Sequence, residues 1–115
     1  MDSLENIVNK ISLFRDKRDW KKYHNPKDMS LSLVLEATEL LEHFQWKDEK
    51  EMNKYVITNK NEIAEELADV FYWLILISHD LNINLIESIN DKMIKNEQKY
   101  PIEKAKGNNK KYNKL

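Results

Sequence analysis

The chain has 115 residues, enough for one domain with a single core but short enough that association between copies would help to bury apolar surface. Its 19 basic and 20 acidic residues almost cancel, which argues against a protein that binds polyanions over its whole surface. Cysteine is absent, which excludes disulfides, thiolate metal sites and cysteine nucleophiles and fits an intracellular protein. We see no signal peptide in MDSLENIVNK and no apolar run long enough for a membrane span, so we expect a cytoplasmic protein.

Apolar residues recur at spacings of three and four, and the chain has only one glycine and two prolines, so the pattern predicts an all-α fold of four helices. The first helix ends near RDKRDW, and its apolar stripe is Leu4, Ile7, Val8, Ile11 and Phe14. After the loop WKKYHN, Asn25 and Pro26 are a suitable cap and first-turn residue for a second helix that ends at about Phe44. Residues 47–59 are highly charged and predict a connector with a short helix in it.

Two more helices are expected in the second half of the chain. One runs from about Lys60 to Leu81, and the other, opened by Asn82 or Asn84, runs to about Lys99. We assign residues 1–103 to the helical domain. Residues 104–115 form a lysine-rich tail whose composition predicts a loose segment.

Acidic residues border the apolar stripes of the second and third predicted helices. At about 100° per residue, Glu36 and Glu39 project about 60° apart beside the stripe of the second helix. The third helix carries four more acids within an arc of about 100°, again beside an apolar stripe: Glu62, Glu65, Glu66 and Asp69. If the two helices pack through their apolar stripes, their acidic margins meet.

Four or more carboxylates in a partly buried place cannot all stay ionised unless a cation joins them. A hard divalent ion with oxygen ligands answers that need, and we expect Mg²⁺, or Mn²⁺ in its place. Acidic residues at this spacing are also typical of a solvated helix face paired with lysines, and this alternative stays open.

Other catalytic chemistries have less support. A di-iron or di-manganese carboxylate bundle requires Glu-x-x-His on two helices, and the sequence has no such motif. His43 follows Glu39 by four residues and His79 stands alone, which favours a surface or packing histidine for the latter. The serines lie in no recognisable nucleophile setting, and one glycine cannot build a phosphate-binding loop.

Several blocks of the sequence resemble a known family. EATE at 36–39 followed by ELAD at 66–69 resembles the ExxE…ExxD signature of the all-α, MazG-like nucleoside triphosphate pyrophosphohydrolases. In order and spacing, four longer blocks are similar to the dCTP pyrophosphatase branch: RDWKKYHNPK at 18–27, LEATELLEHFQWK at 35–47, EELADVFYWL at 65–74, and KMIKNEQKYPIEKAKGNNKKY at 92–112. The resemblance covers nearly the whole chain and implies a helical, oligomeric fold.

The resemblance implies a role for particular residues. The Mg²⁺ ligands would be Glu36, Glu39, Glu66 and Asp69. The nucleotide would contact the stretch from Trp20 to His24, Trp46 beside the base, and the last long helix through Lys92 and Asn96. Without the family, the tryptophans fit a core equally well, and the polar pair fits a solvated face.

Two positions depart from the close relatives that the resemblance points to. Ile11 stands where those relatives have histidine, and Trp73 where they have tyrosine, and both positions belong to their nucleotide pocket. The base preference is therefore open to a larger, more apolar or modified base than cytosine.

The implied reaction is hydrolysis of a deoxynucleoside triphosphate, dCTP or a modified or related pyrimidine nucleotide, to the monophosphate and pyrophosphate. It requires a water in line with the α-phosphorus, a carboxylate to orient or deprotonate it, and Mg²⁺ to offset charge on the leaving group. Glu36, Glu39 and Glu66 are the candidate bases, and four carboxylates predict two or more ions. The tail would place Lys110, Lys111 or Tyr112 over the triphosphate. Nucleic-acid binding by this tail is the weaker alternative, because the rest of the chain is not basic.

The segment VFYWLILI at 70–77 is apolar all round, so a single small protomer leaves part of it uncovered. We expect a homo-oligomer, and the resemblance suggests a tetramer built as a dimer of dimers. A catalytically silent helical module that binds nucleotides or a protein partner stays the alternative function.

Overall fold

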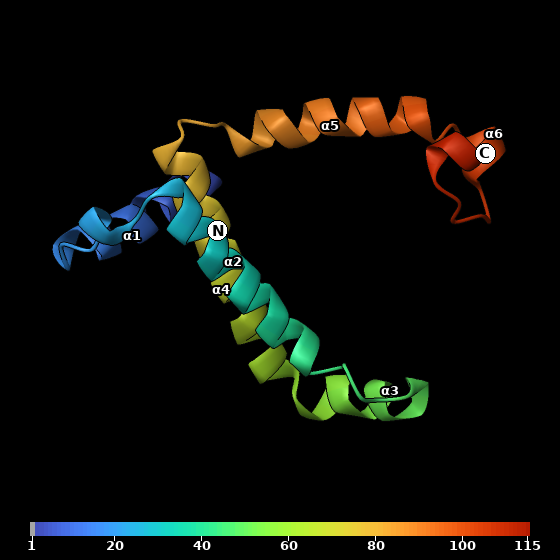
Figure 1. The fold of residues 1–115 in the computed structure, drawn as a ribbon, viewed down its shortest axis with the longest axis horizontal. Helices are drawn as coiled ribbons and strands as arrows, with labels where there is room; N and C mark the ends of the chain where they lie inside the picture. The colour runs from blue at the N-terminus through green and yellow to red at the C-terminus, as the bar shows by residue number, and fades with distance from the viewer. Residues whose placement is uncertain (1) are drawn as a thin grey trace. The chain divides into compact units, whose positions relative to one another are not determined.

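The computed structural model describes residues 2–115, and over that range the chain is helical with no strand (Figure 1). Six α-helices follow one another: α1 (Leu4–Lys17), α2 (Pro26–Glu42), α3 (Glu49–Thr58), α4 (Lys60–Asp80), α5 (Leu85–Lys99) and α6 (Ile102–Ala105). Two short 3₁₀ turns, η1 (Lys21–Tyr23) and η2 (Tyr112–Lys114), complete the order. The all-α class is confirmed.

The expected count of four helices is not confirmed. The connector after α2 holds a helix of ten residues, α3, because Asp48 accepts a hydrogen bond from the Glu51 N–H and caps its start. A single short turn, α6, also forms after Pro101, where we expected only the end of a helix. The chain divides into two compact units, Met1–Leu81 and Asn82–Leu115.

Side-chain caps set most of the helix starts. The predicted start of α2 is confirmed: the Asn25 side chain accepts a hydrogen bond of 2.8 Å from the Asp28 N–H, and Pro26 follows in the first turn. Of the two candidates before α5, Asn84 is the cap. Asn82 instead has a φ of 58°, in the left-handed region, and lies in the turn that follows α4.

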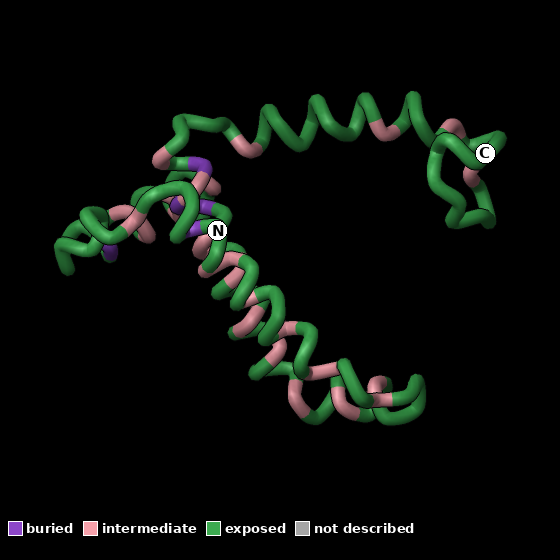
Figure 2. Tube along the Cα trace, viewed as in Figure 1, coloured by how far each residue is buried: buried purple, intermediate pink, exposed green. Residues whose placement is uncertain are grey.

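In the first unit, α2 and α4 run antiparallel along each other, and α1 and α3 both pack against α4 (Figure 1). The few fully buried residues lie at one end of the α2–α4 pair, where α1 joins it (Figure 2). The apolar ones are Met29, Ile75 and Leu76. Large apolar side chains elsewhere on the pair stay exposed, among them Leu35 and Leu67.

A buried ion pair ties α1 to the end of α4. Arg15 is 1% exposed, and its two terminal nitrogens donate hydrogen bonds of 2.7 Å to the two carboxylate oxygens of Asp80. This bidentate geometry is the strong form of the arginine–carboxylate contact. The pair holds the pKa of Asp80 below its usual range, chiefly through the hydrogen bonds from Arg15.

The second unit is a long helix with a folded tail. No residue of α5 is buried within the unit, and its last turn meets the tail, where the rings of Tyr100 and Tyr112 lie edge to face at 6.2 Å. The Lys99 ammonium lies 4.9 Å from the Tyr112 ring centre. Gly107, at a φ of 77°, supplies a left-handed turn between α6 and η2. The tail is thus more structured than its composition predicted.

Among residues 2–115, no helix combines the length and the hydropathy that crossing a membrane requires.

We predict that Asp80→Asn lowers the free energy of unfolding by about 3–5 kcal/mol, because it leaves the buried Arg15 charge without its counter-ion. Urea unfolding followed by circular dichroism measures the change. Asp16→Asn is the matched control: Asp16 is exposed and lies 3.9 Å from the same guanidinium, so its loss should cost less than about 0.5 kcal/mol. Equal effects of the two variants would contradict the assignment.

Candidate functional site

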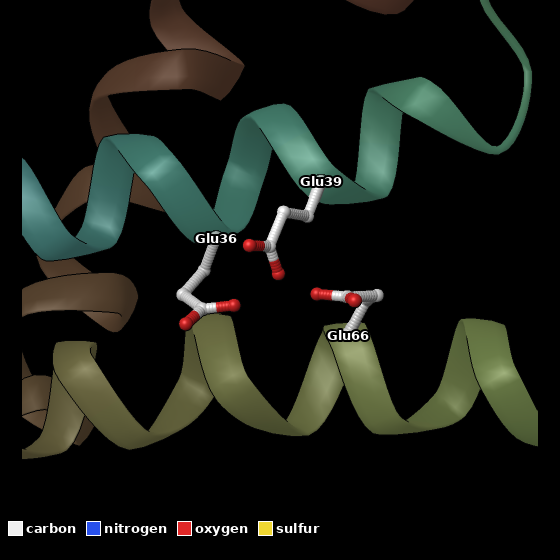
Figure 3. Close-up of side chains that lie close together, drawn as sticks. All are labelled: Glu36, Glu39 and Glu66. Atoms are coloured by element: carbon white, nitrogen blue, oxygen red, sulfur yellow. The ribbon is translucent and has the colours of Figure 1, made fainter.

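Three carboxylates meet between α2 and α4. Glu36 and Glu39, three residues apart on α2, point toward Glu66 on α4 (Figure 3). One oxygen from each of the three lies within 4.8 Å of the others, a spacing at which one metal ion can be shared. We call these three residues the acidic cluster. Its formation follows from the antiparallel packing of the two helices, which brings the acidic margins together as the sequence predicted.

The acidic cluster is under electrostatic strain. Burial, followed by a hydrogen bond with Glu39 and the charges of its acidic neighbours, raises the pKa of Glu36 from its ordinary 4.5 to about 7. Burial and the charge of Glu39 also raise the pKa of Glu66. The Oε2 atoms of Glu36 and Glu66 are buried and have no hydrogen-bond partner. Buried oxygens of this kind, without protein donors, suit coordination by a hard cation.

Asp69 takes a different place from the other three predicted ligands. It is not part of the acidic cluster, but it lines the same cavity as Glu36, and its charge contributes to the raised pKa of Glu36. The structure therefore brings three of the four acids together and leaves the fourth beside one of them.

A cavity of about 670 Å³ opens next to the acidic cluster, lined by α1, the loop after it, α2 and α4. Four of the predicted substrate-binding residues line it: Ile11, Trp20, His24 and Trp73. Glu36 and Asp69 line it as well, so predicted nucleotide contacts and predicted metal ligands share one hollow.

Aromatic rings form most of the cavity wall and touch one another edge to face. Along the wall, ring centres are 5.2 Å apart for His24 and Trp73, 5.2 Å for Trp73 and Tyr72, 6.3 Å for Tyr72 and Phe14, and 5.8 Å for Phe14 and Trp20. Such mutual contacts hold each ring in place and contribute about 0.5–1.5 kcal/mol per pair. The cavity thus has a stiff wall suited to a flat ligand.

Three residues that line this cavity were not predicted from the sequence: Lys10, Phe14 and Tyr72. Helical spacing could have found two of them. Phe14 follows Ile11 by three positions, and Tyr72 follows Asp69 by three, so each shares a helix face with a predicted site residue. Lys10 carries no comparable signal.

A second, smaller hollow of about 280 Å³ lies against the acidic cluster and is polar. It is lined by Glu39, Glu66, Glu42, His43 and Tyr55. The His43 Nδ1 lies 2.5 Å from the Tyr55 hydroxyl, which fixes both rings. The acidic cluster therefore borders an aromatic cavity through Glu36 and a polar hollow through Glu39 and Glu66.

The other predicted contacts lie elsewhere. Trp46 is 86% exposed in the turn after α2 and lines neither hollow, so its contact with the base stays a prediction. Four further residues belong to the second unit, and their contacts with substrate stay predictions too: Lys92, Asn96, Lys111 and Tyr112.

Comparisons with known proteins identify the family of the chain. The MazG-like family profile matches residues 31–115. The dCTP pyrophosphatase 1 of Mus musculus is 35% identical over 98% of this chain and 68% of its own length, and that of Homo sapiens is 33% identical over the same shares. The crystal structure of a pyrophosphatase from Archaeoglobus fulgidus is 40% identical, with a TM-score of 0.83 over 88% of this chain and 94% of that one. The chain belongs to the MazG-like family.

Proposed function

We propose that the chain hydrolyses a deoxynucleoside triphosphate, dCTP or a related or modified pyrimidine nucleotide, to the monophosphate and pyrophosphate with the help of Mg²⁺. Its family and its relatives identify it as a nucleoside triphosphate pyrophosphohydrolase. One observation carries the finer proposal: Glu36 and Asp69 border the same cavity as a wall of aromatic rings. A nucleoside triphosphate needs both surfaces at once, a flat apolar one for its base and a metal-binding one for its phosphates.

The position of the acidic cluster supports one orientation of the substrate. A base stacks on aromatic side chains, and each such contact is worth about 1–3 kcal/mol. The rings lie in the large cavity, so we place the base there and the phosphates toward the acids and the polar hollow. This orientation brings the α-phosphate, which joins the nucleoside to the other two, near Glu36.

The acids fit a divalent cation. Glu36, Glu39 and Glu66 would hold it through their clustered oxygens, and Asp69 would join from the cavity side. Two buried Oε2 atoms without protein donors support this donor set, and all-oxygen donors suit Mg²⁺ or Mn²⁺. When bound, the cation would offset the charge on the phosphates and on the leaving pyrophosphate.

The acidic cluster would also orient the attacking water and accept its proton. The charge of Glu39 helps to raise the pKa of Glu36, so the two carboxylates influence each other's protonation. We therefore assign the proton-accepting role to the acidic cluster as a unit.

Association of copies is part of the proposal. Apolar side chains on α3 and α4 line a third hollow of about 580 Å³: Val56, Ile57 and Leu67, which are exposed, and Ile63, which is half-buried. Contact with another copy of the chain would bury this apolar surface, which stays exposed in the first unit. We therefore propose a homotetramer built as a dimer of dimers. The oligomeric state can be measured by light scattering.

We predict that purified protein releases pyrophosphate from at least one member of a panel of dNTPs and NTPs in Mg²⁺. Glu36→Gln and Asp69→Asn should each lower kcat/KM by about 100-fold or more, because each removes a charge from the phosphate side of the site. Glu62→Gln is the matched control on the exposed part of α4 and should leave turnover unchanged. Binding of dNTPs without turnover by the wild type would favour a silent nucleotide-binding module instead.

We predict that Trp20→Ala raises KM for the preferred dNTP by about tenfold to 100-fold, because it removes a ring from the cavity wall. Steady-state kinetics measures the change. Trp46→Ala tests the exposed tryptophan in the same assay. A larger effect of Trp46→Ala than of Trp20→Ala would place the base outside this cavity.

A third prediction concerns stability without metal. The folded chain raises the pKa of Glu36 to about 7, so ionising this group opposes folding as the pH rises from about 4.5 through 7. In EDTA at pH 8, Glu36→Gln should therefore raise the free energy of unfolding by on the order of 1 kcal/mol. The gain should vanish below about pH 4.5, where Glu36 is protonated in both states.

Urea unfolding at a series of pH values measures this gain, with Glu62→Gln as the control. Adding Mg²⁺ should stabilise the wild type more than Glu36→Gln, since the ion binds only the folded site. A destabilised Glu36→Gln at pH 8 in EDTA would show that the acidic cluster is not strained.

A further inference from the structure

Arg15 is placed to hold the loop that carries two residues of the cavity wall. Its backbone carbonyl accepts a hydrogen bond of 3.2 Å from the Trp20 N–H. Its side-chain Nη1 lies 3.5 Å from Nδ1 of His24 and also donates to Asp80. Trp20 and His24 both line the aromatic cavity, so one buried arginine touches the loop at each of its two wall residues.

The contact with Arg15 determines which nitrogen of His24 carries the proton. A guanidinium has only N–H donors, so the nitrogen that faces it must be an acceptor. Nδ1 is then unprotonated and the proton sits on Nε2. Burial, together with the nearby Arg15 charge, lowers the pKa of His24, which keeps the ring neutral at pH 7. Trp73 lies edge to face against the same ring at 5.2 Å.

Stability alone is a poor explanation for the ion pair. Asp80 is the last residue of α4, where the helix dipole disfavours a carboxylate. The Arg15 Nε is buried without a hydrogen-bond partner, so the guanidinium is incompletely satisfied. Buried ion pairs can often be replaced by apolar residues with no loss of stability. A role in orienting the cavity wall would explain why the chain has a buried Arg15–Asp80 pair that the stability of the fold does not require.

We propose that the Arg15–Asp80 pair positions His24 as a hydrogen-bond donor in the nucleoside cavity, through Nε2–H, toward an acceptor on the base. Asp80 fixes the guanidinium, the guanidinium occupies Nδ1, and Nε2 is left for the ligand. Among residues 2–115, the only hydrogen-bond contact of the His24 ring is the one with Arg15. The base would therefore present a carbonyl oxygen or an unprotonated ring nitrogen at this point. Arg15 and Asp80 are positioning residues, since they act through His24. The proposal rests on the proposed function, because it takes the cavity as the site of the base.

The test uses Arg15→Met combined with Asp80→Leu, which removes both charges together and fills the space with apolar groups. In this double variant the free energy of unfolding should stay near that of the wild type, unlike in Asp80→Asn alone. KM for the preferred dNTP should rise about tenfold, while kcat changes less than about threefold. His24→Gln should raise KM in the wild type but add little in the double variant, because His24 is already released there. Asp19→Asn, in the same loop, is the control and should change neither constant.

A second readout needs no turnover. ¹⁵N spectra of the histidine rings, with His24 assigned from His24→Gln, should show the wild-type ring as the neutral Nε2–H tautomer at pH 7.5 in EDTA. The double variant should show a mixture of tautomers. Should the double variant not fold, Arg15→Lys should give the same tautomer change and rise in KM, because its single, shorter-reaching ammonium nitrogen stays paired with Asp80 and leaves Nδ1 of His24 without a donor.

The outcomes separate the two proposals. An Nδ1–H or mixed tautomer in the wild type would overturn the positioning role while leaving the pyrophosphohydrolase intact. An unchanged KM in a folded double variant would do the same. Absence of turnover on every nucleotide would overturn the proposed function and the base contact with it, whereas the tautomer would still report whether Arg15 holds His24.

Discussion

The antiparallel packing of α2 against α4 is the constraint on which the rest of the molecule depends. It brings Glu36, Glu39 and Glu66 within reach of one another in a partly buried place, where like charges repel and two buried oxygens lack donors. A fold selected for stability alone would place leucine or a lysine partner at these positions. Because the chain places three acids there, their carboxylates repel one another. Binding of a cation would relieve this repulsion. Asp69 is exposed and borders the cavity, so its carboxylate would be accessible to a ligand bound there.

The aromatic wall of the cavity and the acids come from different segments of the chain. The acids lie on α2 and α4, within residues 31–115, the segment that the MazG-like profile matches. Much of the aromatic wall comes from α1 and the loop before α2, outside that segment. A buried guanidinium, that of Arg15, joins the wall residues of that loop to the end of α4. The ion pair therefore joins the loop that carries Trp20 and His24 to the end of α4, one of the two helices that carry the acidic cluster.

Helical periodicity and capping chemistry were enough to predict the class of fold, the start of α2 and the meeting of the acids, because each is a local rule repeated along the chain. Periodicity could not show that Arg15 is buried. A charged residue in a stretch such as FRDKRDW is expected in solvent, and only its partner 65 positions later, Asp80, makes burial tolerable. The same holds for the cavity: Trp20 and Trp73 are far apart in the sequence, and their contacts run through Phe14 and Tyr72. Long-range pairings of this kind leave no periodic signal.

The separation of acids from aromatic wall bears on how the base preference can change. Ile11 and Trp73, the two positions that differ from the relatives suggested by sequence resemblance, both lie on the wall and not in the acidic cluster. Ile11 offers no hydrogen bond to a base, and the larger indole of Trp73 offers a wider stacking face. If the base binds in this cavity, as proposed, a neighbouring donor such as His24 would carry more of the discrimination between bases, since a missing hydrogen bond to a buried polar group costs more than a lost apolar contact. On the proposed function, changes at the wall would thus alter which base is accepted while the acids keep the geometry for the phosphates.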